Sequence, residues 1–432
     1  MAAPACGGGA DLKKILAAPL MTSVSVPSPA IAARLHVFAL VLACLCATTL
    51  AFHHTIALRL YAMGAAAALT FVAGGWRELR TLPLRNAWIV WAVIAAISVA
   101  FAHDRHALDE YSHEVVYAFA AFATWYVLAR RADGARWLAY TLMGVVVAAL
   151  ALGTMRYAQL GTWFDLGEYG DVGTLSTFFV TVLPLLLFLA LRSRAHSAER
   201  IGAIALISGC LVAGFLTLNR MFWFAAAAEI VIFAGSSIRS WQTPRRELWM
   251  AGVVAVVAVL AITEILLASQ SRIALAAPGT GLWDFVVEDP RGDLWRFAVR
   301  EIAEHPVLGT GIGKWSSRAL FDAQFHHPML LHAHNLFLNR ALETGLPGLA
   351  AFVVLLGSVA ILFRRMARSD DGGTSAIGAA GLALVVGVIL KNLTDDFFIR
   401  QNAMLFWSLT GAALGAGAAR QDHASAMAAR SP

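Results

Sequence analysis

Long apolar stretches separated by short polar segments run through most of the chain. An α-helix needs about 20 mostly apolar residues to cross a hydrocarbon layer about 30 Å thick. Twelve stretches of suitable length are predicted, at residues 33–52, 55–75, 86–102, 111–129, 137–156, 174–191, 201–218, 220–238, 247–267, 345–363, 376–394 and 402–419. They are rich in Ala, Leu and Val and lack the alternation typical of a membrane β-barrel. The pattern therefore predicts an all-α, polytopic membrane protein with about twelve transmembrane helices.

The composition supports this class and excludes others. Of the 432 residues, 59% are hydrophobic and 14% are charged, and the mean hydropathy is +0.68. Soluble proteins are about 45–50% apolar and about 25% charged, so a cytosolic enzyme, a secreted disulfide-stapled domain and a disordered protein are excluded. The net charge of +6 suggests an anionic partner, but so apolar a chain is a poor candidate for binding nucleic acid. The four cysteines form no pattern of a disulfide framework or a metal cluster.

The basic residues predict the orientation, because Lys and Arg accumulate on the cytoplasmic side of membrane proteins. With the N-terminus inside, every inner segment before the C-terminal tail holds three Lys or Arg. We therefore expect both termini in the cytoplasm. The expected organisation is a cytoplasmic tail at 1–32, helices 1–9 at 33–267, a periplasmic loop at 268–333, a periplasmic helix start with helices 10–12 at 334–419, and a cytoplasmic tail at 420–432.

The long loop at 268–333 carries arginines, tryptophans and histidines on the outer side, against the orientation bias. A loop of this length is usually functional. A helix is predicted at about 293–304, with Trp295, Val299 and Ile302 on one apolar face. On that helix Arg296 and Arg300 form a like-charged pair. Two interpretations stay open: acidic neighbours neutralise the arginines in solvent, or the arginines face a phosphate.

Glycines and histidines follow this helix. The run Gly309-Thr-Gly-Ile-Gly313-Lys314 lacks the spacing of a phosphate-binding loop and predicts a tight turn between helices. Next come His326, His327, His332 and His334, which suit either zinc binding or proton transfer near neutral pH. Proton transfer is the preferred interpretation, because no Cys or correctly spaced Glu completes a zinc site. His334 is expected in the first turn of a helix that the segment from Gly345 to Gly348 closes.

Three motifs in this order resemble the O-antigen ligase superfamily, which also contains O-antigen polymerases and O-linked oligosaccharyltransferases. The first is Arg291-Gly-Asp-Leu-Trp295 followed by His305-Pro-Val-Leu-Gly-Thr-Gly311. The second is His334-Asn335 followed, after nine residues, by Gly345-Leu-Pro-Gly348. The third is Asn219-Arg220 at an outer helix end. The sequence departs from the family pattern at Leu349 and Met221, which affects the choice among family members.

The resemblance implies a GT-C-like glycosyltransferase of the bacterial inner membrane, acting in lipopolysaccharide biosynthesis on the periplasmic side. It implies transfer of a preassembled O-antigen glycan from undecaprenyl pyrophosphate to a sugar hydroxyl of lipid A–core, without metal or cofactor and with inversion. His334 is expected to be the general base. Arg220 and Arg291 are expected to bind the pyrophosphate, because guanidinium groups hold phosphate oxygens bidentately. His332 and Arg296 are secondary candidates.

Two other functions stay open at this point. A polymerase of the same superfamily would lengthen the glycan on its lipid carrier, and a polytopic transporter would need no catalytic histidine. Asp395 and Asp396 could orient the histidine or the arginines, or could pair with Lys391 or Arg400. Glu229 lies midway along a predicted span and should face a cavity or a partner, since a carboxylate is costly in hydrocarbon.

Overall fold

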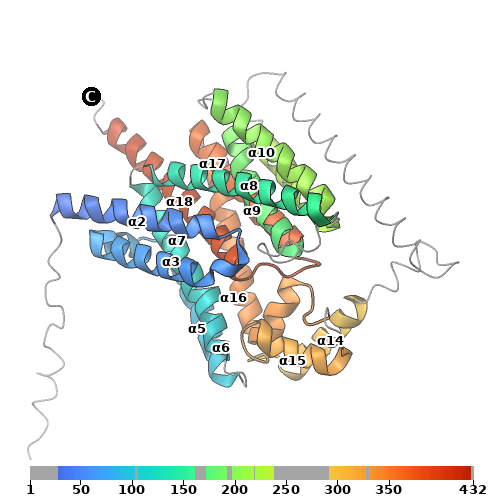
Figure 1. Ribbon diagram of the computed structural model, residues 1–432. Coiled ribbons are helices and arrows are strands. Elements are labelled where there is room, and N and C mark those ends of the chain that lie inside the picture. Colours follow the sequence, from blue (N-terminus) through green and yellow to red (C-terminus); the bar gives the residue numbers. More distant parts are fainter. Residues whose placement is uncertain are drawn as a thin grey trace, which may run out of the picture.

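The computed structural model describes residues 28–102, 106–131, 133–160, 172–191, 197–217, 219–237, 291–326 and 330–429. Within these ranges the regular structure is entirely helical. Figure 1 shows the long helices gathered in one bundle, with α14 (Arg291–Glu304) and α15 (Lys314–Phe325) together at the lower right. The predicted all-α fold is therefore confirmed over this part of the chain.

The remaining helices follow the predicted spans closely. The first half contains α2 (Pro29–Thr49), α3 (Ile56–Thr70), η2 (Phe71–Gly75), α4 (Trp76–Leu79), α5 (Arg85–Phe101), α6 (Ala107–Tyr111), η3 (Ser112–Val116), α7 (Tyr117–Arg130) and α8 (Gly134–Leu160). The second half adds α9 (Val172–Leu191), α10 (Ser197–Leu216), α11 (Arg220–Ser237), α16 (Leu336–Ala367), α17 (Gly372–Lys391) and α18 (Arg400–Ala428). Eleven predicted spans coincide with these helices.

The number of spans is supported only in part. Seven helices in the described ranges are long and apolar enough to cross a membrane, among them α2, α8, α9, α16 and α17. The ninth predicted span, at 247–267, lies outside the described residues, as do the predicted N-terminal tail up to residue 27 and the loop residues 268–290 and 327–329. The chain is a multi-pass helical membrane protein, and the count of twelve stays a prediction.

Close helix contacts hold the bundle together. α7 packs along α18, and a Cβ atom at Gly411 would lie 2.2 Å from the carbonyl oxygen of Phe122. Small residues allow such approaches between membrane helices. Glu229 of α11 is fully buried against Gly387 of α17, and neither of its carboxyl oxygens has a hydrogen-bond partner within the described part of the chain. Glu229 is thus buried within the bundle, and the predicted cavity or partner for its carboxyl group stays a prediction.

α14, α15 and the first turns of α16 share a separate small core. Its buried residues include Leu294, Phe297, Ala298, Ile302 and Phe321. The side of α14 that meets this core is not the predicted face of Trp295, Val299 and Ile302: Ile302 is buried, but Val299 is 55% exposed and Trp295 is only partly buried. Leu294, Phe297 and Ala298 form a second stripe, and contact with α15 selects that stripe for the core.

α16 is bent at Gly345, where the backbone has φ 70° and ψ 179°. A Cβ atom there would lie 2.3 Å from the carbonyl oxygen of Val307. The Leu346 N–H donates to the carbonyl of Pro306, and the Thr310 N–H donates to that of Leu342. The glycine turn between α14 and α15, predicted from the sequence, is thus present and is bonded to the bend in α16.

Candidate functional site

His334 lies immediately before α16, in the segment that follows α15. Asn335 is the N-cap of the helix, and its side-chain oxygen accepts hydrogen bonds from the Phe337 and Leu338 N–H groups. The prediction that His334 lies in the first helical turn was therefore wrong by two positions. The backbone of His334 is left-handed, with φ 48°, a conformation that non-glycine residues adopt uncommonly. Such strain persists where the surroundings enforce it.

Neighbouring side chains enforce this conformation from two helices. The Trp295 indole N–H on α14 donates to the carbonyl of Ala333 at 2.9 Å. The Asn339 side chain on α16 accepts from the Ala333 N–H at 3.0 Å and donates its own amide to Asp396. The His334 N–H donates to Nδ1 of His332, and the two imidazole rings lie 3.9 Å apart. These contacts fix the direction in which the His334 ring points.

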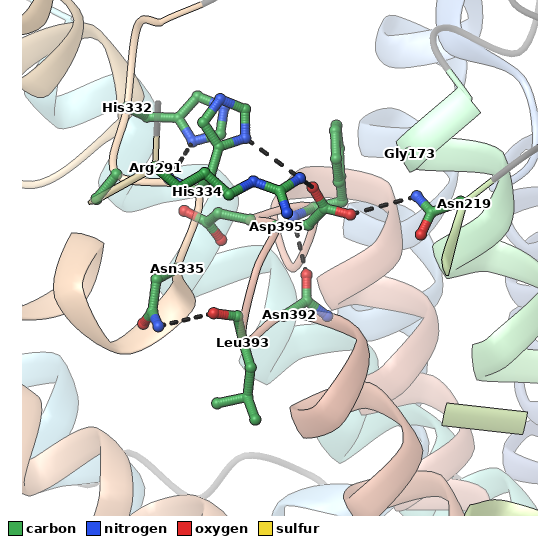
Figure 2. Close-up of polar contacts among 12 residues, drawn as sticks. Gly173, Asn219, Arg291, His332, His334, Asn335, Asn392, Leu393 and Asp395 are labelled. Atoms are coloured by element: carbon green, nitrogen blue, oxygen red, sulfur yellow. Dashed lines mark hydrogen bonds and ion pairs between the residues drawn. The ribbon is translucent and has the colours of Figure 1, made fainter. Parts of the chain in front are cut away.

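Asp395 is the centre of the polar contacts around that ring, as Figure 2 shows. Its Oδ2 accepts from the Lys391 ammonium at 2.8 Å and from the Asn219 amide at 3.3 Å. Its Oδ1 lies 3.9 Å from His334 Nδ1 and 3.8 Å from an Arg291 nitrogen. One carboxylate thus joins the starts of α11, α14 and α16 to the end of α17.

The charges around Asp395 keep it ionised. Burial raises the pKa of its carboxyl group, but the Lys391 ammonium, the Arg291 guanidinium and the Asn219 amide together outweigh burial and leave the pKa below its ordinary value. An ionised Asp395 suits an orienting role, because a carboxylate facing Nδ1 favours the tautomer with hydrogen on Nδ1 and leaves Nε2 as the basic atom.

The structure brings together some of the predicted site residues and separates others. Arg291, His332 and His334 lie within the cluster around Asp395, and Arg220 is the first residue of α11, next to Asn219. Arg296 is 81% exposed on the outer face of α14 and pairs with Asp293. The interpretation in which an acidic neighbour neutralises Arg296 therefore agrees with the structure, and Arg296 is not part of this cluster.

The sequence left two roles open for Asp395 and Asp396, which were orienting the site residues and pairing with a cation. The structure shows contacts of both kinds. Asp395 pairs with Lys391 and also faces the histidine, whereas Asp396 accepts from Asn339. Arg400 instead pairs with Glu110 at 2.6 Å. Of the four histidines, His332 and His334 lie side by side, His326 is exposed at the end of α15, and His327 lies outside the described residues.

Sequence reasoning named Lys391 only as a possible partner of the aspartates and gave Asn219 and Asn335 no supporting role in the site. Asn219 and Lys391 bind Asp395, and the Asn335 amide donates to the Leu393 carbonyl at 2.8 Å. Of these residues, Lys391 was the easiest to recognise in the sequence, because it is a lysine at the end of an apolar span, four residues before an aspartate. The Asn219 contact joins residues 176 positions apart, and no local pattern indicates it.

Beneath the cluster, a fully buried ion network lies between α16 and η3. Arg340 contacts the carboxylates of Glu114 and Glu343, and the Glu343 carbonyl accepts from the Ser98 hydroxyl at 2.7 Å. Two carboxyl groups that face one guanidinium carry a compensating proton or another cation, because an uncompensated buried charge is costly. This network anchors the first part of α16, and with it Asn335, to the bundle.

Part of the chain is similar to a known protein family. A family model described as O-antigen ligase matches residues 179–353. The matched region includes Asn219, Arg220, Arg291 and His334 but ends before Lys391 and Asp395. The comparison with curated proteins gave no match. The match covers less than half of the chain, and over residues 179–353 the chain is similar to the O-antigen ligase family.

Proposed function

We propose that this protein is an O-antigen ligase of the bacterial inner membrane. It transfers a preassembled O-antigen polysaccharide from undecaprenyl pyrophosphate to a sugar hydroxyl of lipid A–core on the periplasmic side. The observation that carries the proposal is the convergence of Arg291, His334 and Asp395 at the ends of spanning helices, beside the helices of the long loop. A site at a helix end suits a reaction between two membrane-anchored substrates.

In this reaction the acceptor hydroxyl attacks the anomeric carbon while the bond to the pyrophosphate breaks. His334 accepts the hydroxyl proton through Nε2, and Asp395 stabilises the imidazolium that forms. Arg291 and Arg220 hold the phosphate oxygens of the leaving group, whose charge increases as the bond breaks. His332 lies beside the base and helps to hold it in place. Direct displacement inverts the anomeric centre, and the residues named here require no metal.

Charge balance supports the assignment of the arginines. Lys391 is fully buried at 2.8 Å from Asp395, so this pair is nearly neutral as a unit. Arg291, in contrast, is 39% exposed and lies at 3.8 Å from the carboxylate. Its guanidinium is therefore more accessible to an incoming anion than the buried Lys391 ammonium, which pairs with the aspartate. This division favours Arg291 over Lys391 as the ligand of the pyrophosphate.

Reconstitution tests the proposal. The purified protein is mixed with carrier-linked glycan and lipid A–core in the presence of a chelator, and glycan-capped core is measured. We expect His334→Ala and His334→Asn to abolish transfer, while His326→Asn, the same change at an exposed histidine that also has a left-handed backbone, retains it. Asn is chosen because it tolerates the left-handed backbone of His326. Activity of His334→Ala near that of the wild type refutes the base assignment.

The same reaction mixture separates the ligase from the polymerase. Transfer to lipid A–core without lengthening of the carrier-linked glycan supports the ligase. Lengthening of the carrier-linked glycan without transfer to core indicates a polymerase and contradicts the proposal.

A further inference from the structure

A cavity lies between the segment that joins α4 to α5 and the last turns of α16. Its volume is about 480 Å³. Arg80, Arg85 and Arg365 line it together with the neutral polar residues Thr81, Asn86 and Ser358, and no acidic residue is among its lining residues in the described part of the chain. A cavity with three cations and no counter-charge suits an anionic ligand.

This cavity is at the opposite end of the bundle from His334. α5 packs antiparallel along α16: Ser98 bonds to the Glu343 carbonyl near the bend, Trp91 contacts Phe352, and Arg85 begins the helix near Arg365. Residues 343 and 365 are separated by about 33 Å at 1.5 Å per residue. The cavity therefore lies one membrane thickness away from the candidate active site, at the other membrane–water boundary.

The backbone adds to the positive potential of the arginines. α5 is 17 residues long, and its N-cap residue, Leu84, provides no side-chain hydrogen bond to the first N–H groups. Leu84 is also in the left-handed conformation, with φ 67°. The Arg85 guanidinium donates to the Arg80 carbonyl at 2.8 Å, which brings two cationic segments together. The positive end of a helix dipole and its N–H groups favour an anion at this position.

Apolar side chains surround the charged end of the cavity. Leu82, Ile361 and Leu362 are among its lining residues, and Ile361 and the neighbouring Ile89 on α5 are both 53% exposed. The cavity thus offers cations at the boundary and an apolar surface directly beside them. A phospholipid has the complementary arrangement, with an anionic phosphate joined to acyl chains. A free phosphate ion would use only the charged part.

We propose that this cavity binds the headgroup of an anionic membrane phospholipid, with its phosphate on Arg80, Arg85 and Arg365 and its acyl chains along Ile89 and Ile361. Basic pockets between transmembrane helices recognise such headgroups in general. The bound lipid joins the start of α5 to the end of α16. In the proposed orientation it belongs to the cytoplasmic leaflet.

The test uses the full-length protein in nanodiscs of phosphatidylcholine with increasing amounts of phosphatidylglycerol, and bound lipid is counted by native mass spectrometry. The variant is R80Q/R85Q/R365Q. The matched control is R77Q/R364Q/R368Q, which removes the same charge from the same end of the bundle without changing the cavity lining. Each arginine is expected to contribute about 5-fold to the affinity for the headgroup. We therefore expect the cavity variant to bind phosphatidylglycerol about 100-fold more weakly than wild type, and the control to bind it within about 5-fold of wild type.

Three outcomes overturn the proposal. One is equal weakening in the cavity variant and the control, which indicates general attraction to a charged surface. The second is wild-type binding of phosphatidylglycerol no tighter than that of phosphatidylcholine. The third is complete displacement of the lipid by millimolar glycerol phosphate, which indicates a site for a soluble phosphate. If the triple variant does not fold, the single variant R365Q, with an expected loss of about 5-fold, answers the same question against R364Q.

Discussion

Asp395 offers the sharpest test of the site, because its contacts predict separable effects on stability and on activity. Asp395→Asn keeps the shape of the side chain and removes its charge. The Lys391 ammonium, whose side chain is fully buried, then loses the carboxylate at 2.8 Å that compensates it. Breaking a buried ion pair on one side costs about 3–5 kcal/mol, because it leaves the other charge uncompensated. We expect the free energy of unfolding to fall by this amount.

A double-mutant cycle separates the two roles. Lys391→Met alone costs less, because Arg291 and Asn219 still contact Asp395. The double variant K391M/D395N buries no unpaired charge, so it should regain about 1–3 kcal/mol relative to D395N. It should nevertheless remain inactive, because the carboxylate that faces His334 is absent.

The stability of the four proteins is measured by unfolding in mixed detergent micelles with increasing dodecyl sulfate, and transfer is measured on the folded fractions. Two results refute the reasoning. If D395N loses less than about 1 kcal/mol, the buried pair is not a significant stabilising contact. If the double variant regains transfer together with stability, Asp395 acts only on the fold and does not orient His334.

Three further predictions test neighbouring parts of the site. Because the pKa of Asp395 is held below its ordinary value of 3.8, its stabilising contribution should be fully present above that pH and be lost as the pH falls further. Unfolding of wild type between about pH 2 and 5 should show this loss, and D395N should lack it. Arg291→Lys should lower the rate of transfer about 100-fold if a bidentate contact stabilises the leaving group, and a full rate in the reconstituted assay would indicate charge alone. Gly345→Ala should lower the free energy of unfolding by about 1–3 kcal/mol, because Gly345 has a positive φ and lies close to the Val307 carbonyl. Gly357→Ala on the same helix, where a Cβ atom meets no atom within 4 Å, should not lower it in the same unfolding measurement.

Most of the helical layout could be predicted from the chain. The long helices of the bundle coincide with predicted apolar stretches because a helix must be apolar over about 20 residues to cross the hydrocarbon layer. The glycine turn before α15 was also predictable, since the spacing of its glycines fits no phosphate-binding loop. The apolar face of α14 was harder to predict. Two stripes of similar hydrophobicity compete on this helix, and only the contact with Phe321 of α15 decides between them.

Some of the site residues could also be predicted from the sequence, and the role of others could not. Arg291 could be singled out because basic residues on the outer side oppose the orientation bias, and Arg291 and His334 both stand in motifs of the family that the sequence resembles. Asp395 was recognised as a candidate partner, but its role could not be chosen, because pairing with Lys391 and contact with His334 are equally compatible with its position in the chain. The structure shows that one carboxylate makes both contacts.

The sequence by itself determined the class of protein and the position of most spans, and it singled out the segment that carries Arg291. These properties depend on local hydrophobicity and on residue type, which can be read position by position. Only the tertiary structure decided which side chains meet. Asn219, Arg291, His334 and Asp395 come from four separate segments, and they converge because α11, α14, α16 and α17 begin or end at the same place. Packing between distant helices produces this convergence, and such packing leaves no pattern in the neighbouring residues of the chain.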